Sequence, residues 1–203
     1  MPADIRADSV LAFWFEDGLQ RGWPSRSLSA LWFGGGEVLD DDIRRRFGPL
    51  VDEALAGGLI EWQLAPLQRL ALVVLLDQFS RNVYRGQAKA FAGDARAQSL
   101  ATDALATGQD TPLPLAGRVF LGMPLMHAES LELQDRCIGF FETLVACSPP
   151  ERADDLQAHL QAACEHREII AAFGRFPHRN AVLGRTTSAD ERSYLATGKR
   201  FGQ

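Results

Sequence analysis

The sequence is poor in cysteine and has no long apolar run. Its 203 residues include only three cysteines, Cys137, Cys147 and Cys164, and none belongs to a C-x-x-C pair. An odd number without regular spacing indicates reduced thiols and argues against a disulfide scaffold. The longest apolar run, 70–76, is far shorter than the roughly 20 residues that cross a bilayer. The first residues also lack the basic start and apolar stretch of a signal peptide. We therefore expect a soluble, cytoplasmic protein with no membrane partner.

Signatures of known catalytic and cofactor sites are missing as well. There is no H-E-x-x-H, no G-x-S-x-G and no Rossmann glycine pattern in the chain. The run Gly34-Gly35-Gly36 lacks the lysine and the spacing of a phosphate loop, so it indicates a turn. His159 and His166 lie two helical turns apart, about 10 Å along the axis, which is too far to hold one metal ion. We expect no cofactor and no metal.

Charge of one sign dominates only in a short segment. The chain as a whole carries a net charge of −5, which argues against nucleic acid as a partner. Residues 174–186, however, contain three arginines and one histidine and no acid. This uneven distribution favours the binding of a small anion. With 46% hydrophobic and 23% charged residues, the composition is that of a globular protein, and we expect one helical domain over 1–203.

Apolar spacing predicts an all-α fold, because no stretch alternates convincingly enough for a sheet. Pro124 is predicted to begin a long helix, and Ser188 with Glu191 three residues later forms a capping-box pattern at the start of the last one. Short loops between helices indicate antiparallel pairs. The expected helices are 9–15, 28–33, 40–56, 66–81, 94–106, 115–121, 126–147, 151–173 and one that starts at 188.

A first polar cluster lies at 75–82, late in the apolar helix 66–81. Asp77 interrupts the apolar run, and Arg81 projects from the same face four residues on. Gln78 and Asn82 form a second pair with this spacing. One interpretation is an internal Asp77–Arg81 ion pair, which is a common structural device. The other is a polar cleft floor in which Arg81 faces a ligand.

A second polar cluster lies at 124–130. If Pro124 begins a helix, then His127, Ser130 and Gln134 share one face of it. A histidine near a helix N-terminus stays neutral and could act as a base or a metal ligand. The alternative is a hydrogen-bonded interior histidine. Glu129 lies in the same segment.

The third cluster is a helix end and the loop that follows it, at 166–185. Arginine forks bind carboxylate or phosphate in a bidentate manner, so this segment is a candidate anion site. The alternative is that the arginines cap helix carbonyls and pair with Asp77, Glu129 or Glu165 elsewhere in the fold. The polar residues of this cluster are His166, Arg175, His178, Arg179, Asn180 and Arg185.

These clusters give the chain a resemblance to a known family. Over about 9–195 it resembles the bacterial family catalogued as "domain of unknown function 924". The resemblance implies an array of antiparallel helix pairs similar to a tetratricopeptide-repeat superhelix. The matching segments are 13–15, 32–33, 76–82, 85–86, 90–91, 124–127 with Glu129, 173–180 and 183–185.

Three functional hypotheses follow from the sequence. The first is a binding module whose arginine-rich pocket takes a small anion or an acidic peptide terminus. The second is an enzyme that uses acid–base groups among Asp77, His127, Glu129, His166 and His178. The third is a protein–protein interaction scaffold with structural polar networks. The candidate ligand-binding residues are Asp77, Gln78, Arg81, Asn82, His127, Glu129, His166, Arg175, His178, Arg179, Asn180 and Arg185.

Overall fold

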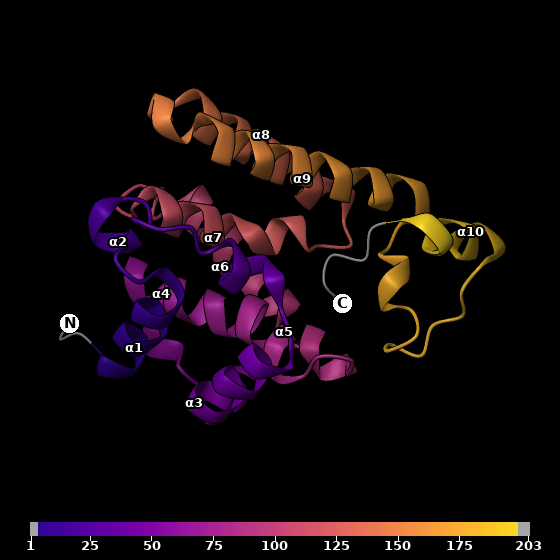
Figure 1. Cartoon of the computed structure of the whole chain (residues 1–203), viewed down its shortest axis with the longest axis horizontal. Helices are drawn as coiled ribbons and strands as arrows, with labels where there is room; N and C mark the ends of the chain where they lie inside the picture. Colours follow the sequence, from indigo (N-terminus) through magenta and orange to yellow (C-terminus); the bar gives the residue numbers. More distant parts are fainter. Residues whose placement is uncertain (1–3, 199–203) are drawn as a thin grey trace. The chain divides into compact units, whose positions relative to one another are not determined.

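A computed structural model describes residues 4–198, and within this range the chain forms helices and no strand. The all-α prediction is therefore confirmed for these residues. None of the helices within 4–198 has the length and apolar character needed to traverse a lipid bilayer. The α-helices are α1 Ile5–Phe15, α2 Gly18–Arg21, α3 Glu37–Leu55, α4 Pro66–Val73, α5 Ser80–Val83, α6 Asp94–Ala106, α7 Leu115–Met126, α8 Leu131–Ala146, α9 Ala153–Phe173 and α10 Ala189–Thr197 (Figure 1). Shorter 3₁₀ or π segments are η1 Ala30–Gly34, η2 Ile60–Gln63, η3 Val74–Phe79, η4 Ala88–Phe91, η5 Pro150–Arg152 and η6 Pro177–Arg179.

The described chain divides into two compact units, 4–124 and 125–198, which we call the N-terminal and C-terminal units. The core of the N-terminal unit is built on aromatic side chains of α1, η3 and α7. Trp14 packs edge-on against Phe79 at 5.4 Å and against Phe120 at 5.6 Å between ring centroids. All three rings are almost completely buried, and edge-to-face packing of this kind adds to the free energy gained from burial.

The apolar stretch 66–81 is helical from its first residue, as predicted. Pro66 occupies the first turn of α4, where its missing N–H costs no hydrogen bond. The helix then widens into the π segment η3 and continues as α5. Every residue from Arg69 to Phe79 except Gln78 is buried, which explains why the sequence is apolar nearly all round.

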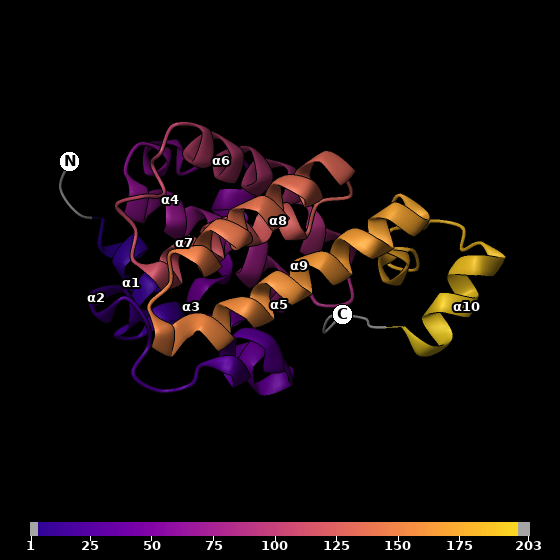
Figure 2. The same cartoon turned by 90° about the horizontal axis from the view of Figure 1, so that it is seen from above.

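In the C-terminal unit, α8 and α9 lie side by side and antiparallel, and both views show them as a pair (Figures 1 and 2). Phe141 stacks on His159 with ring centroids 5.9 Å apart, and Arg167 pairs with Asp135 at 2.5 Å. After α9, η6 and α10 enclose a small core in which Ile169, Ile170 and Phe176 are buried.

The prediction that Pro124 begins a long helix over 126–147 is wrong. Pro124 lies inside α7, near its C-terminal end, and α8 starts only at Leu131. The start signal is Ser130, whose hydroxyl accepts a hydrogen bond from the backbone N–H of Leu133. Consequently His127 follows the C-terminus of a helix instead of lying near an N-terminus. The sequence argument that depended on a helix N-terminus at His127 therefore does not apply.

Candidate functional site

The first polar cluster, in the N-terminal unit, is an internal charge network. Arg81 contacts Asp77 at 3.5 Å, as the sequence suggested. Its stronger partner is Asp94, whose two carboxylate oxygens accept hydrogen bonds of 2.9 and 3.3 Å from the guanidinium. Burial alone would lower the pKa of Arg81, but the carboxylates of Asp94 and Asp77 raise it above its ordinary value. Arg81 is thus held by two acids from within its own unit.

The amides of the same cluster are also engaged inside the unit. Gln78 donates a hydrogen bond to Asp77 at 2.6 Å, and Asn82 donates one to Asp40 at 2.8 Å. Asp40 also accepts two hydrogen bonds from Arg85, of 2.6 and 2.9 Å. Burial would raise the pKa of Asp40, but Arg85 and Asn82 hold it below its usual value. Gln78 and Asn82 therefore donate hydrogen bonds to two different carboxylates, those of Asp77 and Asp40.

Two arginines of the third cluster form bidentate ion pairs within the C-terminal unit. Arg175 donates to both oxygens of Glu191, at 2.6 and 2.9 Å. Arg185 donates to both oxygens of Glu129, at 2.8 Å each. Burial would raise the pKa of Glu129, but Arg185 and the backbone N–H of Phe176 lower it. The Arg185–Glu129 pair is one of those proposed from the sequence, whereas the role of Glu191 was missed.

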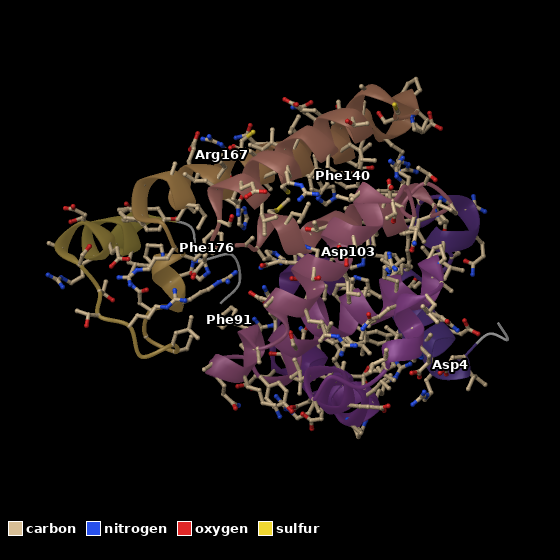
Figure 3. The ribbon with its side chains drawn as sticks, turned by 180° about the vertical axis from the view of Figure 1, so that it is seen from behind. Asp4, Phe91, Asp103, Phe140, Arg167 and Phe176 are labelled. Atoms are coloured by element: carbon tan, nitrogen blue, oxygen red, sulfur yellow. The ribbon has the colours of Figure 1, made fainter. Side chains whose placement is uncertain are left out.

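The remaining basic residues of the second and third clusters meet around Phe176, which is labelled in Figure 3 and is fully buried. Its ring centroid lies 5.6 Å from that of His166 and 5.5 Å from that of His178. The guanidinium carbon of Arg179 lies 4.5 Å from the centroid of the same ring. The rings of His127 and His166 are 6.1 Å apart. Three histidines and one arginine thus gather from the end of α7, from α9 and from η6.

The turn that carries His127 is held by hydrogen bonds to three successive carbonyls. Gln134 donates to the carbonyls of Met126 and Ala128, at 2.7 and 2.8 Å, and Arg179 donates to that of His127 at 3.2 Å. These contacts fix the end of α7 against α8 and η6. Within the described residues, the side-chain oxygens of Gln134 and Asn180 are buried and accept no hydrogen bond.

His166 is the residue of this cluster whose pKa is most strongly changed by burial. Its Nδ1 lies 2.7 Å from the carbonyl of Ala162, and the residue is 5% exposed. Burial lowers its pKa to about 3, and the charges of His127, Arg179 and His178 act in the same direction. His166 is therefore neutral at physiological pH, mainly because it is buried.

The structure places the candidate residues in two separate groups. The first cluster belongs to the N-terminal unit, and the second and third converge in the C-terminal unit. Sequence reasoning missed Asp94 as the partner of Arg81 and Glu191 as the partner of Arg175, whereas it had already placed Gln134 near His127. Of these two acids, only Glu191 carried a local signal, the capping box with Ser188, and this box is present. No group of three or more histidine, cysteine or acidic side chains within 4–198 could hold a metal ion.

Comparisons with known proteins found one family model and a similar solved structure. A family model described as "Bacterial protein of unknown function (DUF924)" matches residues 10–199. A solved structure of a protein of unknown function from Agrobacterium tumefaciens, ATU0120, is 33% identical in sequence and superposes with a TM-score of 0.77. The match covers 95% of this chain and 97% of that chain. No curated protein matches the chain.

Proposed function

This chain belongs to the DUF924 family of bacterial proteins of unknown function, and we propose that its C-terminal unit binds a small anion, a carboxylate or phosphate group. The observation that carries the proposal is the convergence of His127, His166, His178 and Arg179 around Phe176. Three separate segments bring these groups together. Arg179 supplies a fixed positive charge and the imidazole rings supply hydrogen-bond donors, both of which favour an anion.

The ion pairs described above narrow the choice of anion-binding side chains. Arg175 and Arg185 each bind a glutamate in bidentate fashion, so binding a ligand there would require breaking a close pair. Arg179 stacks on the ring of Phe176, donates to the carbonyl of His127 and helps to lower the pKa of Glu129. We assign the anion to Arg179, whose guanidinium is held in place by that stacking, with His127 and His178, both partly exposed, at the entrance.

The buried acceptors restrict the chemistry of the ligand further. The side-chain oxygens of Gln134 and Asn180 require hydrogen-bond donors, because a buried acceptor without a partner costs about 1–3 kcal/mol. A hydrogen phosphate or a peptide C-terminus supplies both an anionic oxygen and an O–H or N–H donor. An acidic peptide terminus and a free phosphate are thus the ligands to test.

The test is a thermal-shift titration with inorganic phosphate and with N-acetylglycine, a mimic of a peptide terminus. We expect both the wild type and Arg167→Gln to melt higher with the bound ligand, and Arg179→Gln to show no ligand-specific rise. Arg167 is the matched control, because its pair with Asp135 lies on the surface of the same unit. General stabilisation by excluded phosphate affects all variants equally and is subtracted.

A second variant guards against misfolding of Arg179→Gln, since Arg179 also holds the turn at His127. His178→Gln removes the imidazole at the entrance and should reduce the ligand-induced shift by about half or more. Equal shifts in wild type, Arg179→Gln and His178→Gln would refute the assignment. The same conclusion would follow if neither ligand changed the melting temperature of the wild type.

We also infer that the helices form an array similar to a tetratricopeptide-repeat superhelix. The antiparallel pair of α8 and α9, with its Phe141–His159 and Asp135–Arg167 contacts, supports this arrangement. Such arrays present concave surfaces that hold peptides and other chains. Small-angle scattering of the whole protein tests the inference, because a stacked array and a compact bundle differ in radius of gyration.

A further inference from the structure

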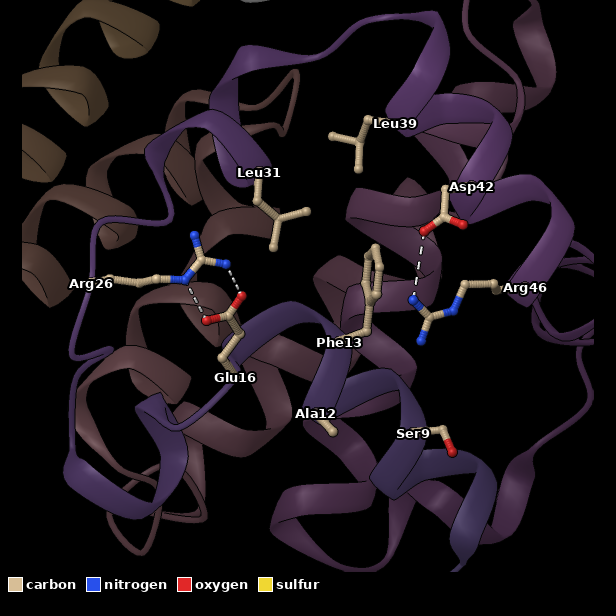
Figure 4. A pocket seen from close by; sticks show the side chains of 9 residues that line it. All are labelled: Ser9, Ala12, Phe13, Glu16, Arg26, Leu31, Leu39, Asp42 and Arg46. Atoms are coloured by element: carbon tan, nitrogen blue, oxygen red, sulfur yellow. Dashed lines mark hydrogen bonds and ion pairs between the residues drawn. The ribbon is translucent and has the colours of Figure 1, made fainter.

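The N-terminal unit contains an open groove with an apolar floor and charged edges (Figure 4). Its volume is about 620 Å³, within the range of small-molecule sites. Phe13 of α1 lies in the middle of the groove, with Leu31 of η1 and Leu39 of α3 facing it from the other side. Figure 4 shows Glu16 with Arg26 on one side of Phe13, and Asp42 with Arg46 on the other.

The floor of the groove is rigid. The ring of Phe13 packs on Phe47 with a centroid separation of 5.2 Å and edge-on to the buried Phe79 at 5.8 Å. Phe47 and Phe79 are themselves 4.9 Å apart. An aromatic surface fixed in this way loses little conformational entropy when a ligand packs against it.

Arg46 lies over this floor. Its guanidinium carbon is 4.5 Å from the ring centroid of Phe13 and 5.2 Å from that of Phe47. A guanidinium that stacks on two rings presents its N–H edge in a fixed plane, which suits a planar carboxylate. The side chain is 47% exposed, so an incoming ligand can reach it.

The two edges of the groove differ in how closely their charges are paired. At one edge Arg26 donates to both oxygens of Glu16, so this pair is closed and neutral. At the other edge the single carboxylate of Asp42 is shared between Arg45, which hydrogen-bonds to it, and Arg46, which lies 3.5 Å away. The two acids and two arginines that line the groove balance in charge, but Arg46 is held by its acid less closely than Arg26 is.

We propose that this groove binds a small apolar monocarboxylate, with its carboxylate on Arg46 and its apolar body against Phe13, Leu31 and Leu39. The exposed, loosely paired guanidinium of Arg46 selects a carboxylate, and the apolar floor selects a molecule with a hydrocarbon part. This site lies outside the C-terminal unit and does not depend on the anion site proposed there. Both an acyl chain with a free carboxylate and the C-terminal leucine of a peptide have the required chemistry.

The first experiment is isothermal calorimetry of the whole protein with hexanoate, and with hexanamide as a neutral analogue of the same shape. We expect hexanoate to bind the wild type and hexanamide to bind about tenfold more weakly or not at all. Arg46→Gln should lose about tenfold in affinity for hexanoate, and Arg46→Lys should recover part of it. N-acetyl-leucine distinguishes the sources, because tighter binding than hexanoate indicates a peptide terminus.

Arg21→Gln is the matched control. Arg21 forms an exposed i,i+4 pair with Asp17 at 3.6 Å, as Arg46 does with Asp42 at 3.5 Å, but it does not line the groove. The Arg21→Gln variant should bind hexanoate with the same affinity as the wild type. Arg179→Gln should do so too, which separates this site from the anion site of the C-terminal unit.

Three results would overturn the proposal. One is an affinity for hexanoate that Arg46→Gln leaves unchanged, and another is equal affinity for hexanoate and hexanamide. The third is concentration-dependent dimerisation that Leu31→Asp abolishes and hexanoate does not reverse, because a second copy of the chain would then occupy the groove.

Discussion

Buried and half-buried charges in this protein are balanced by partners that come from distant parts of the chain. Glu129 binds Arg185 across 56 positions, and Asp40 binds Arg85 across 45. Because a buried charge without its partner costs several kcal/mol, each of these pairs restricts which helix ends can lie together. The sequence indicates that Arg81 pairs with an acid four residues away, Asp77. It does not reveal that Asp94 is the closer partner of Arg81. That choice depends on how η4 brings α6 back to α5, which no local rule determines.

His166 differs from these residues because it is buried in its neutral form, and this makes stability depend on pH. Its pKa is about 3 in the folded protein, whereas an unfolded histidine has a value of about 6.5. Between these values the unfolded chain binds a proton that the folded chain does not. Stability therefore falls as the solution is acidified from pH 6.5. From pH 7 to pH 5 we expect His166 to cost about 2 kcal/mol of unfolding free energy.

Urea denaturation at pH 7 and at pH 5 measures this dependence, with His166→Gln beside the wild type. The variant should lose less stability between the two pH values, whatever its stability at pH 7. His159, whose pKa is lowered to about 4 mainly by burial, contributes to both proteins equally and cancels in the comparison. An identical loss in wild type and variant would show that His166 is exposed to solvent or already protonated.

At the scale of helices, the sequence predicts interiors well and ends unevenly. The segment 94–106 is helical over the predicted residues, and the capping box at Ser188 is present. The boundary at Pro124 fails, because proline is a weaker signal than a cap. Its missing N–H is tolerated near the end of α7, and the Ser130 hydroxyl begins α8. The π turn of η3 also escapes prediction, since apolar periodicity does not reveal how a buried helix adjusts around Asp77.

The helix α10 depends on one residue, Glu191, for its start and its attachment. Its carboxylate accepts hydrogen bonds from the backbone N–H of Ser188 and from Arg175. We expect Glu191→Ala to accelerate amide exchange in α10 by about tenfold or more, because cap and ion pair are lost together. Hydrogen–deuterium exchange with mass spectrometry measures this. Glu168→Ala, at an exposed position on α9, is the control and should leave α10 unchanged.

At the scale of the whole molecule, the question is whether the two units unfold together. The division falls between Pro124 and Leu125, inside the single helix α7, and not in a linker. Separate domains are normally joined by exposed, polar or glycine-rich segments with little structure of their own. A helix that supplies residues to both units cannot be cut at that point without losing its backbone hydrogen bonds. One domain over 1–203, including the ends outside the described residues, is thus the prediction to test.

The chain carries its own probes for this test. All four tryptophans, Trp14, Trp23, Trp32 and Trp62, belong to the N-terminal unit, and all three cysteines belong to the C-terminal unit. Intrinsic fluorescence therefore follows one unit, while the reactivity of the fully buried Cys137 follows the other. We expect both signals to change at the same urea concentration, as two-state unfolding requires. A Cys137 that becomes reactive while the tryptophan emission is still native would instead show two domains that unfold separately. Replacing both the exposed Cys147 and the partly exposed Cys164 by serine in both measurements removes the background reaction.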